Sequence, residues 1–157
     1  MTALSLSSSI MASVAARSLA TCIFCKIVKG EIPSFKLVET ELSYSFLDIG
    51  PLSKGHALVI PKDHAVKMHE LPDEYLADAM PLAKKIAVAQ GLDNYNILQN
   101  NGRIAHQEVD HVHFHVIPKP SAGDTEGLVI GWPAKKANMD ELKAYHAELV
   151  GKLEGKL

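Results

Sequence analysis

Hydrophobic and polar residues alternate, or hydrophobic residues run unbroken for a strand's length, in five parts of the chain. A side-chain period of two is typical of β-strands, and each stretch is bounded by glycine, proline or polar residues. The pattern predicts strands over residues 35–39, 42–48, 55–60, 94–99 and 109–117. The two-residue link Thr40-Glu41 predicts that the first two strands form a hairpin.

Three other stretches carry apolar residues at helical spacing. The first is a short helix over residues 21–28, which Gly30 ends. Pro72 opens a longer helix, and Pro81 within it predicts a kink or a split. The third helix is predicted in the C-terminal tail, over residues 139–152.

These elements predict an α+β fold. Strands outnumber helices and most connections are too short for parallel crossovers, so we expect an antiparallel sheet of about five strands with the helices on one side. The chain has 157 residues, 47% of them hydrophobic, which suits one domain with a core of its own over residues 21–157.

Residues 1–20 differ in composition from the rest. They are rich in serine and alanine, contain one arginine and lack acidic residues. This composition predicts an N-terminal extension that is either disordered or a mitochondrial targeting segment. If it does not target, the cytoplasm, and with it the nucleus, is the expected location.

Charge and cysteine content narrow the classes of partner. The net charge of −2 gives no electrostatic reason to expect nucleic acid, and no apolar run approaches the length of a membrane span. We therefore expect neither nucleic acid nor membrane as a partner. The two cysteines, Cys22 and Cys25, have a Cys-x-x-Cys spacing that indicates metal or redox chemistry in an intracellular protein.

Three histidines alternate with apolar residues in the last predicted strand. His111, His113 and His115 therefore share one face, with β-branched and aromatic residues on the other. Clustered imidazoles can supply a nucleophile, an acid and a phosphate donor near neutral pH, which favours group transfer. Zinc ligation and a merely solvated strand face are the two alternatives that the spacing leaves open.

The stretch His111-Val-His-Phe-His-Val-Ile117 has the pattern, three histidines each followed by an apolar residue, that gives the histidine triad family its name. Further matching stretches follow the order of that family, at residues 22–27, 46–49, 55–62, 100–102, 104–115 and 131–133. Over about residues 22–133 the chain therefore resembles the nucleotide-binding branch of the histidine triad (HIT) family of nucleotide hydrolases and transferases.

The resemblance implies an enzyme. It would cleave the P–N bond of adenosine 5′-phosphoramidates, such as AMP-NH2 or AMP-lysine adducts, to AMP through a nucleotidyl-histidine intermediate, with no cofactor required. It would bind AMP and purine nucleoside phosphoramidates. It would also be a homodimer whose sheet continues across the interface.

The resemblance also implies roles for four histidines. His113 would be the nucleophile and His115 a donor to the phosphate. His111 would orient the surroundings of the nucleophile, and His56 would supply a further donor.

A second group of residues would bind the nucleotide. Asp48 would hold the ribose hydroxyls, although a strand-end aspartate also suits a turn. Asn100 would contact the ribose-phosphate region, although Asn-Asn-Gly by itself indicates a turn. The backbone amides around Gln107 and Glu108 would face the phosphate. The apolar slot for the base would consist of residues that could equally be core, namely Ile23, Phe24, Ile27, Phe46 and Ile49.

Trp132 would lie near the partner subunit's site, or else serve as a packing anchor. Two departures from the family pattern lie near the leaving group. His106 and Glu108 stand where a glycine and a serine or threonine are common, which leaves the general acid open, and the tail continues 25 residues past Trp132.

Cys22, Cys25, His64 and His111 resemble a Cys2His2 zinc site of some relatives, which would be structural. The alternative is two small buried cysteines.

Other functions remain open at this point. A dinucleoside polyphosphate hydrolase is a second enzyme, although the Trp132 tail and the loop over residues 100–109 favour the phosphoramidase branch. A nucleotide-binding interaction protein with incidental catalysis and a metal-dependent hydrolase are the other two.

Overall fold

The computed structural model describes residues 19–123 and 125–156. The prediction for residues 1–20 thus lies almost wholly outside the described residues. The elements follow the order α2 (Ile23–Val28), β1 (Lys36–Glu39), β2 (Ser43–Leu47), β3 (Ala57–Pro61), η1 (Met68–Glu70), α3 (Asp73–Ala89), β4 (Tyr95–Leu98), η2 (Arg103–Ala105), β5 (Phe114–Pro118) and α4 (Met139–Glu154).

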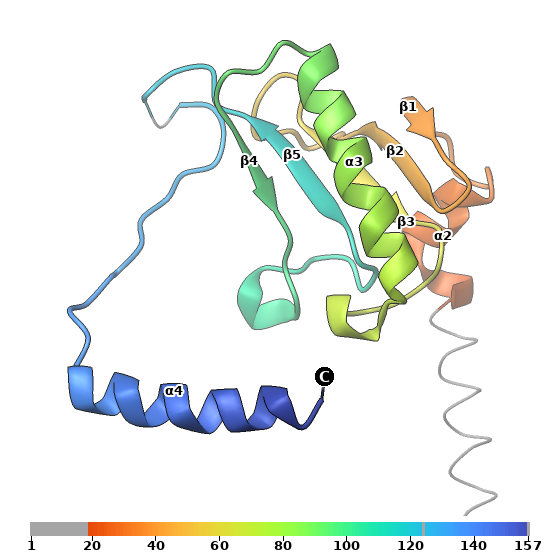
Figure 1. The fold of residues 1–157 in the computed structure, drawn as a ribbon. Coiled ribbons are helices and arrows are strands. Elements are labelled where there is room, and N and C mark those ends of the chain that lie inside the picture. Colours follow the sequence, from red (N-terminus) through yellow and green to blue (C-terminus); the bar gives the residue numbers. More distant parts are fainter. Residues whose placement is uncertain (1–18, 124, 157) are drawn as a thin grey trace, which may run out of the picture.

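The five strands form one antiparallel sheet in the order β1-β2-β3-β5-β4 (Figure 1). The predicted β1–β2 hairpin is confirmed, with an irregular register between Lys36 and Val38. β1 and β4 are the edge strands. The antiparallel α+β fold predicted from the sequence is therefore confirmed.

The two faces of the sheet have separate cores. α3 packs its buried Leu82, Ala83 and Ile86 against one face, which includes Val59 and Phe114. The short helix α2 covers part of the other face, where its buried residues pack against strand residues such as Tyr44 and Ile60. The predicted arrangement, with the helices on one side of the sheet, therefore describes α3 but not α2. Residues on both faces of β3 are buried, so each face needs a covering element.

Pro81 does not split α3. The helix runs unbroken over 17 residues with Pro81 inside it. Proline removes the hydrogen bond to the carbonyl four residues earlier, here Ala77, and both residues lie on the exposed side, where water can solvate that carbonyl. The apolar residues on the opposite side of the helix stay packed in the core.

The last strand is shorter than predicted and begins at Phe114 instead of residue 109. His111 and His113 lie in the irregular segment before it. The amide of His111 donates to the carbonyl of Val109 (2.8 Å), and the amide of Val112 donates to the carbonyl of Ala65 (2.8 Å). These bonds interrupt the regular sheet ladder at His111 and His113. The predicted alternation still holds, because Val112, Phe114 and Val116 pack in the core on the α3 face, while the rings of His111 and His113 pack against Phe24 on the other face, with His115 beside His113.

The C-terminal part runs along the outside of the domain. After β5 the chain passes the β4 side of the sheet and descends to α4, which has no buried residue (Figure 1). Asn138 caps α4 by accepting from the amides of Asp140 and Glu141. Among the described residues, no helix combines the length and the apolar character that a membrane span requires.

Candidate active site and metal centre

The histidine cluster lies where β3 and β5 meet, on the face that α2 partly covers. His115 pairs with Leu58 across these strands. Its ring centroid lies 4.9 Å from that of His113, and its Nδ1 lies 2.9 Å from Nε2 of His56. His56 comes from the end of the β2–β3 connection. The fold thus brings together histidines that are up to 59 residues apart.

Hydrogen bonds fix the tautomers of His56 and His115. The amide of Leu52 donates to Nδ1 of His56 (3.1 Å), so the proton of this neutral ring is on Nε2. Nε2 of His56 therefore donates to Nδ1 of His115. As a result, Nε2 of His115 carries the remaining proton and is a hydrogen-bond donor.

His113 has the opposite polarity. Its Nδ1 donates to the carbonyl of His111 (2.6 Å), which leaves a lone pair on Nε2. The edge of the Phe24 ring packs against the His113 ring with centroids 5.2 Å apart. The cluster therefore presents a nucleophilic nitrogen on His113 beside a donor on His115.

The cluster is neutral at neutral pH. Burial, with the nearby rings of His113 and His56, lowers the pKa of His115 to about 4. Burial also lowers the pKa of His113 and of His56, although Asp48 opposes the shift of both. Neutral imidazole is the form that can act as a nucleophile.

Asp48 borders the same cluster. Its Oδ2 lies 3.7 Å from Nε2 of His56, and its Oδ1 accepts from the amide of Gly50 (2.8 Å). This carboxylate, which the sequence analysis predicts to bind the ribose hydroxyls, is half-buried just after the end of β2 and lies within reach of the histidines. It also forms, with His56 and His115, a group close enough to hold a cation.

The five residues predicted for the base slot divide into two sets. Phe24, Ile27 and Phe46 are buried in the α2 core. Ile23 and Ile49 are 43% and 87% exposed. Of the five, only Ile23 and Ile49 offer exposed apolar surface, while the other three are part of the buried core.

The loop before β5 is held by Gln107. Its side-chain amide donates to the carbonyls of Val66 (2.7 Å) and Val109 (3.0 Å) and accepts from the amide of Gly102 (2.6 Å). Its own backbone amide donates to the carbonyl of Gly102. Gln107 is thus committed to the loop, and a phosphate-facing amide has to come from its neighbours.

Three other loop residues carry predictions. Asn100 donates from its side chain to the carbonyl of His106 (3.2 Å), which ties the two ends of the loop together. His106 adopts the left-handed conformation with φ 62°. The side chain of Glu108 is exposed.

Trp132 is not brought to the histidines within one chain. It is 80% exposed, in the segment between β5 and α4 that runs away from the cluster (Figure 1).

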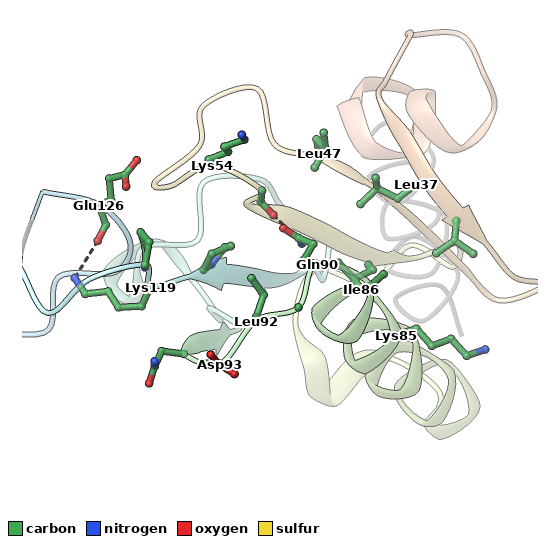
Figure 2. Close-up of a pocket in the computed structure, with 17 residues that line it drawn as sticks. Leu37, Leu47, Lys54, Lys85, Ile86, Gln90, Leu92, Asp93, Lys119 and Glu126 are labelled. Atoms are coloured by element: carbon green, nitrogen blue, oxygen red, sulfur yellow. Dashed lines mark hydrogen bonds between the residues drawn. The ribbon is translucent and has the colours of Figure 1, made fainter.

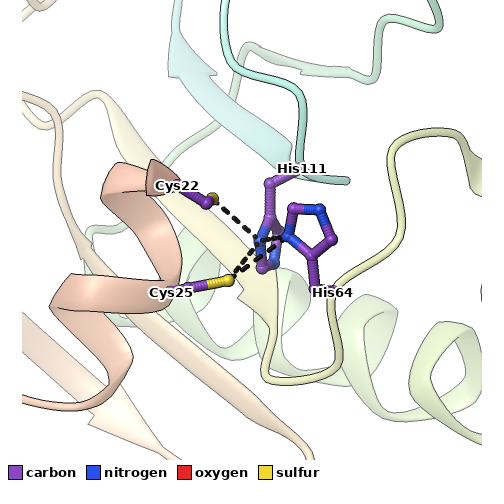
Figure 3. A group of neighbouring side chains, drawn as sticks. All are labelled: Cys22, Cys25, His64 and His111. Carbon is purple, nitrogen blue, oxygen red and sulfur yellow. Dashed lines mark hydrogen bonds between the residues drawn. The ribbon is translucent and has the colours of Figure 1, made fainter. Parts of the chain in front are cut away.

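The metal ligands suggested by the resemblance converge on one point. Cys22 and Cys25 reach from α2 toward His64 and His111, as Figure 3 shows. Nδ1 of His111 lies 3.5 Å from each sulfur and 3.2 Å from Nδ1 of His64, which lies 3.3 Å from the sulfur of Cys25. Nε2 of His111 donates to the carbonyl of Pro61 (2.8 Å), so the Nδ1 lone pair faces the sulfurs.

This arrangement fits zinc. Tetrahedral zinc with bonds of about 2.0–2.3 Å requires ligand atoms about 3.3–3.8 Å apart, close to the spacing observed. Burial and the adjoining Cys22 raise the pKa of Cys25 to about 12, so the Cys25 side chain stays a thiol until a cation displaces its proton. The donor set is closed, as structural zinc sites are.

A separate groove of about 1100 Å³ lies at the C-terminal end of α3 (Figure 2). Leu37, Leu47, Ile86 and Leu92 line it, with lysines at its edge. None of the histidines or cysteines described above borders it. The chemistry-bearing side chains therefore single out the histidine cluster, and not this groove, as the candidate active site.

Sequence reasoning missed the backbone groups that set the tautomers. The Leu52 amide and the Pro61 carbonyl fix His56 and His111. Backbone groups have no residue-type signal; the only hint was the Gly50-Pro51 turn, which brings the Leu52 amide back toward His56.

The comparisons with known proteins agree with this site. The HIT domain family matches residues 29–122. The adenosine 5′-monophosphoramidase HNT1 of Saccharomyces cerevisiae is 62% identical over 136 residues, which cover 87% of this chain and 85% of that protein. The adenosine 5′-monophosphoramidase hnt1 of Schizosaccharomyces pombe is 62% identical over 134 residues, which cover 85% of this chain and 99% of that protein. The structure of a histidine triad nucleotide-binding protein from Candida albicans superimposes with a TM-score of 0.83 and 52% identity, covering 87% of this chain and 100% of that chain.

Proposed function

Since the chain belongs to the HIT domain family, we propose that it hydrolyses the P–N bond of adenosine 5′-phosphoramidates, releasing AMP and an amine. The observation that carries the proposal is the pair of opposed tautomers: Nε2 of His113 has a lone pair, and Nε2 of His115 has a proton. The relatives named as adenosine 5′-monophosphoramidases support the substrate class.

The reaction proceeds in two displacements at the α-phosphorus. Nε2 of His113 forms a bond to phosphorus while the P–N bond breaks, and the electron pair of the P–N bond stays on the nitrogen, which has taken a proton from solvent and departs as a neutral amine. Water then forms a P–O bond and releases one proton to solvent, the P–Nε2 bond breaks, and its electron pair returns to His113. The net reaction consumes one water and yields AMP and one amine.

The other site residues stabilise this sequence. His115 donates to a phosphate oxygen, and His56 keeps His115 in the tautomer that can donate. The carbonyl of His111 orients His113. Asp48 accepts from the ribose hydroxyls, Ile23 and Ile49 contact the base over the support of Phe24, and Asn100 and the Glu108 amide complete the nucleotide site.

The test is turnover of adenosine 5′-phosphoramidate and of diadenosine polyphosphate in the presence of chelator, with His113→Ala and the exposed-histidine control His146→Ala. We expect AMP release from the phosphoramidate to fall more than about 1,000-fold in His113→Ala only. Turnover of the polyphosphate instead would make the chain a dinucleoside polyphosphate hydrolase. AMP binding without turnover would favour a nucleotide-binding interaction protein. Loss of activity in the presence of chelator would favour a metal-dependent hydrolase.

We also propose that Cys22, Cys25, His64 and His111 hold a structural zinc ion, while catalysis needs no cofactor. The ion would join α2 to the segments after β3 and before β5. Elemental analysis should find about one zinc per chain in the wild type and in the control variant His146→Ala, which keeps all four proposed ligands. It should find far less zinc in Cys25→Ala. Zinc-free wild-type protein, purified without chelator, would refute the site.

Finally, we propose a homodimer that pairs along the edge strand β4, with Trp132 reaching the partner's site. β4 has one free edge, with Tyr95 and Ile97 40% and 43% exposed, and exposed apolar residues continue in the tail at Val129 and Ile130. Contiguous apolar surface of this kind is typical of protein interfaces. Location in the cytoplasm, and with it the nucleus, stays a prediction.

A further inference from the structure

The hydrogen bond that sets the tautomer of His113 does not by itself hold its ring in place. Nδ1 of His113 donates to the carbonyl of His111 (2.6 Å), and this bond fixes one atom of the ring. The nucleophilic Nε2 lies on the other side of the ring, so its direction depends on the plane in which the ring is held. A second contact is therefore needed to fix that plane.

Among the described residues, two other aromatic rings pack against that of His113. The centroid of the His115 ring lies 4.9 Å away, but His115 is itself the donor to the phosphate. The centroid of the Phe24 ring lies 5.2 Å away, with 74° between the two ring planes. Such edge-to-face packing is a favourable arrangement of two aromatic rings. Phe24 therefore gives His113 a rigid apolar wall that takes no part in the chemistry.

Phe24 is itself held firmly. Its ring is buried, and the ring centroids of Phe46 and His111 lie 5.8 and 5.9 Å from its own. In the sequence it lies between Cys22 and Cys25, whose sulfurs are each 3.5 Å from Nδ1 of His111. A helix of six residues such as α2 is too short to be stable alone, so these contacts decide where Phe24 lies.

We propose that Phe24 is a positioning residue, whose ring keeps Nε2 of His113 directed at the α-phosphorus; this inference rests on the phosphoramidase function proposed above. Displacement at phosphorus is roughly in line, so attack succeeds only over a narrow range of directions. A misplacement of about 1 Å can cost about 100-fold in rate. The family resemblance implied a place in the base slot for Phe24, but a ring that is 6% exposed has little surface to offer a base.

The two roles of Phe24 lead to different kinetics. A residue of the base slot binds the ground state and the transition state alike, so its loss raises KM and leaves kcat unchanged. A positioning residue acts on the geometry of attack. Its loss therefore lowers kcat, while KM and the affinity for AMP change little.

The test measures kcat and KM for adenosine 5′-phosphoramidate, and the Kd of AMP, with wild type, Phe24→Leu, Phe24→Met and the control Tyr44→Leu. Leucine and methionine keep an apolar side chain in the core but lack the rigid ring edge. Tyr44 is buried in the same α2 core, where its ring packs against Phe46. Tyr44→Leu thus removes a ring from this core, but not one that packs against the nucleophile.

In both Phe24 variants we expect kcat to fall roughly 10- to 100-fold, with KM and the Kd of AMP within about threefold of wild type. Tyr44→Leu should leave kcat within about threefold. In NMR spectra, the ring signals of His113 should be single and sharp for wild type and Tyr44→Leu, but broadened or doubled in the Phe24 variants. Circular dichroism reports whether each variant is folded, and the flexible methionine of Phe24→Met serves if Phe24→Leu does not fold.

Unchanged kcat in a folded Phe24 variant would overturn the positioning role, and a rise in KM and Kd beside it would return Phe24 to the base slot. An equal loss of kcat in Tyr44→Leu would also overturn the role, because the effect would then come from core packing in general. Wild type that does not turn over the phosphoramidate would instead refute the proposed function. The NMR comparison would then still test whether Phe24 holds the ring of His113, so the two failures are distinguishable.

Discussion

At the scale of single residues, the site depends on side chains held in one chemical form by backbone groups. A single proton on the wrong nitrogen of His56 would leave His115 without a proton to donate, since the Leu52 amide, His56 and His115 form one chain of hydrogen bonds. Burial lowers the pKa of both rings, so they stay neutral and keep these tautomers at neutral pH. Stability and catalysis therefore respond to the same protonation.

We expect stability to fall as the pH drops from about 6.5 toward 4. The pKa of His115 is about 4 in the folded protein, below the 6.5 of an unfolded histidine, so the unfolded state binds more protons between these values. Its contribution is fully present above pH 6.5, and about 1 kcal/mol of it is lost by pH 5.5. Urea denaturation at pH 7.5 and 5.5 should show a smaller loss for His115→Asn than for wild type and for the exposed-site control His146→Asn. Equal losses in all three would contradict the argument.

His106 is a second residue with a conformational cost. A side chain with a Cβ at φ 62° is strained by about 1–2 kcal/mol, whereas glycine is not. We expect His106→Gly to unfold with a free energy about 1 kcal/mol higher than that of His106→Ala, after allowance for the greater freedom of glycine in the unfolded chain. The comparison in denaturant uses two variants that both lack the imidazole. A more stable alanine variant would show that the loop relaxes.

At the scale of elements, periodicity predicted where strands and helices occur but not how they end. All five strands are present, and the tail helix begins at Met139 as predicted. The late start of β5, at Phe114 instead of residue 109, was not predictable, since it follows from hydrogen bonds to Val109 and to the distant Ala65. The convergence of Cys22 and Cys25 on His64 came from resemblance, because no local pattern relates residues 39 positions apart.

The segment after β5 makes an element-scale prediction at Gly127. Its φ is 83°, and an added Cβ would lie 2.9 Å from the carbonyl oxygen of Pro118. Its amide donates to the carbonyl of Leu52 (2.8 Å), next to the loop that orients His56. We expect Gly127→Ala to lower the free energy of unfolding by about 1–2 kcal/mol. The control Gly131→Ala, where a Cβ meets nothing within 4 Å, should be close to neutral.

At the scale of the whole molecule, the described residues of a single chain leave both sheet edges and the tail uncovered. β1 and β4 are both edge strands, but the exposed apolar residues of the tail adjoin only β4, whose residues border a shallow pocket with Leu128 and Ile130. A second copy paired along β4 would cover both the edge and this part of the tail. It would also bring Trp132 of each chain toward the other.

We therefore expect the wild type to have about twice the chain mass of 17.0 kDa in solution, by light scattering. Ile97→Arg places like charges at the proposed interface and should yield the monomer, while Leu37→Arg on the opposite edge strand should not. If Trp132 completes the partner's site, Trp132→Ala should lower kcat in the dimer and have little further effect in an Ile97→Arg background. Additive losses in that double variant would place the effect of Trp132 within its own chain, and a monomeric wild type would refute the dimer itself.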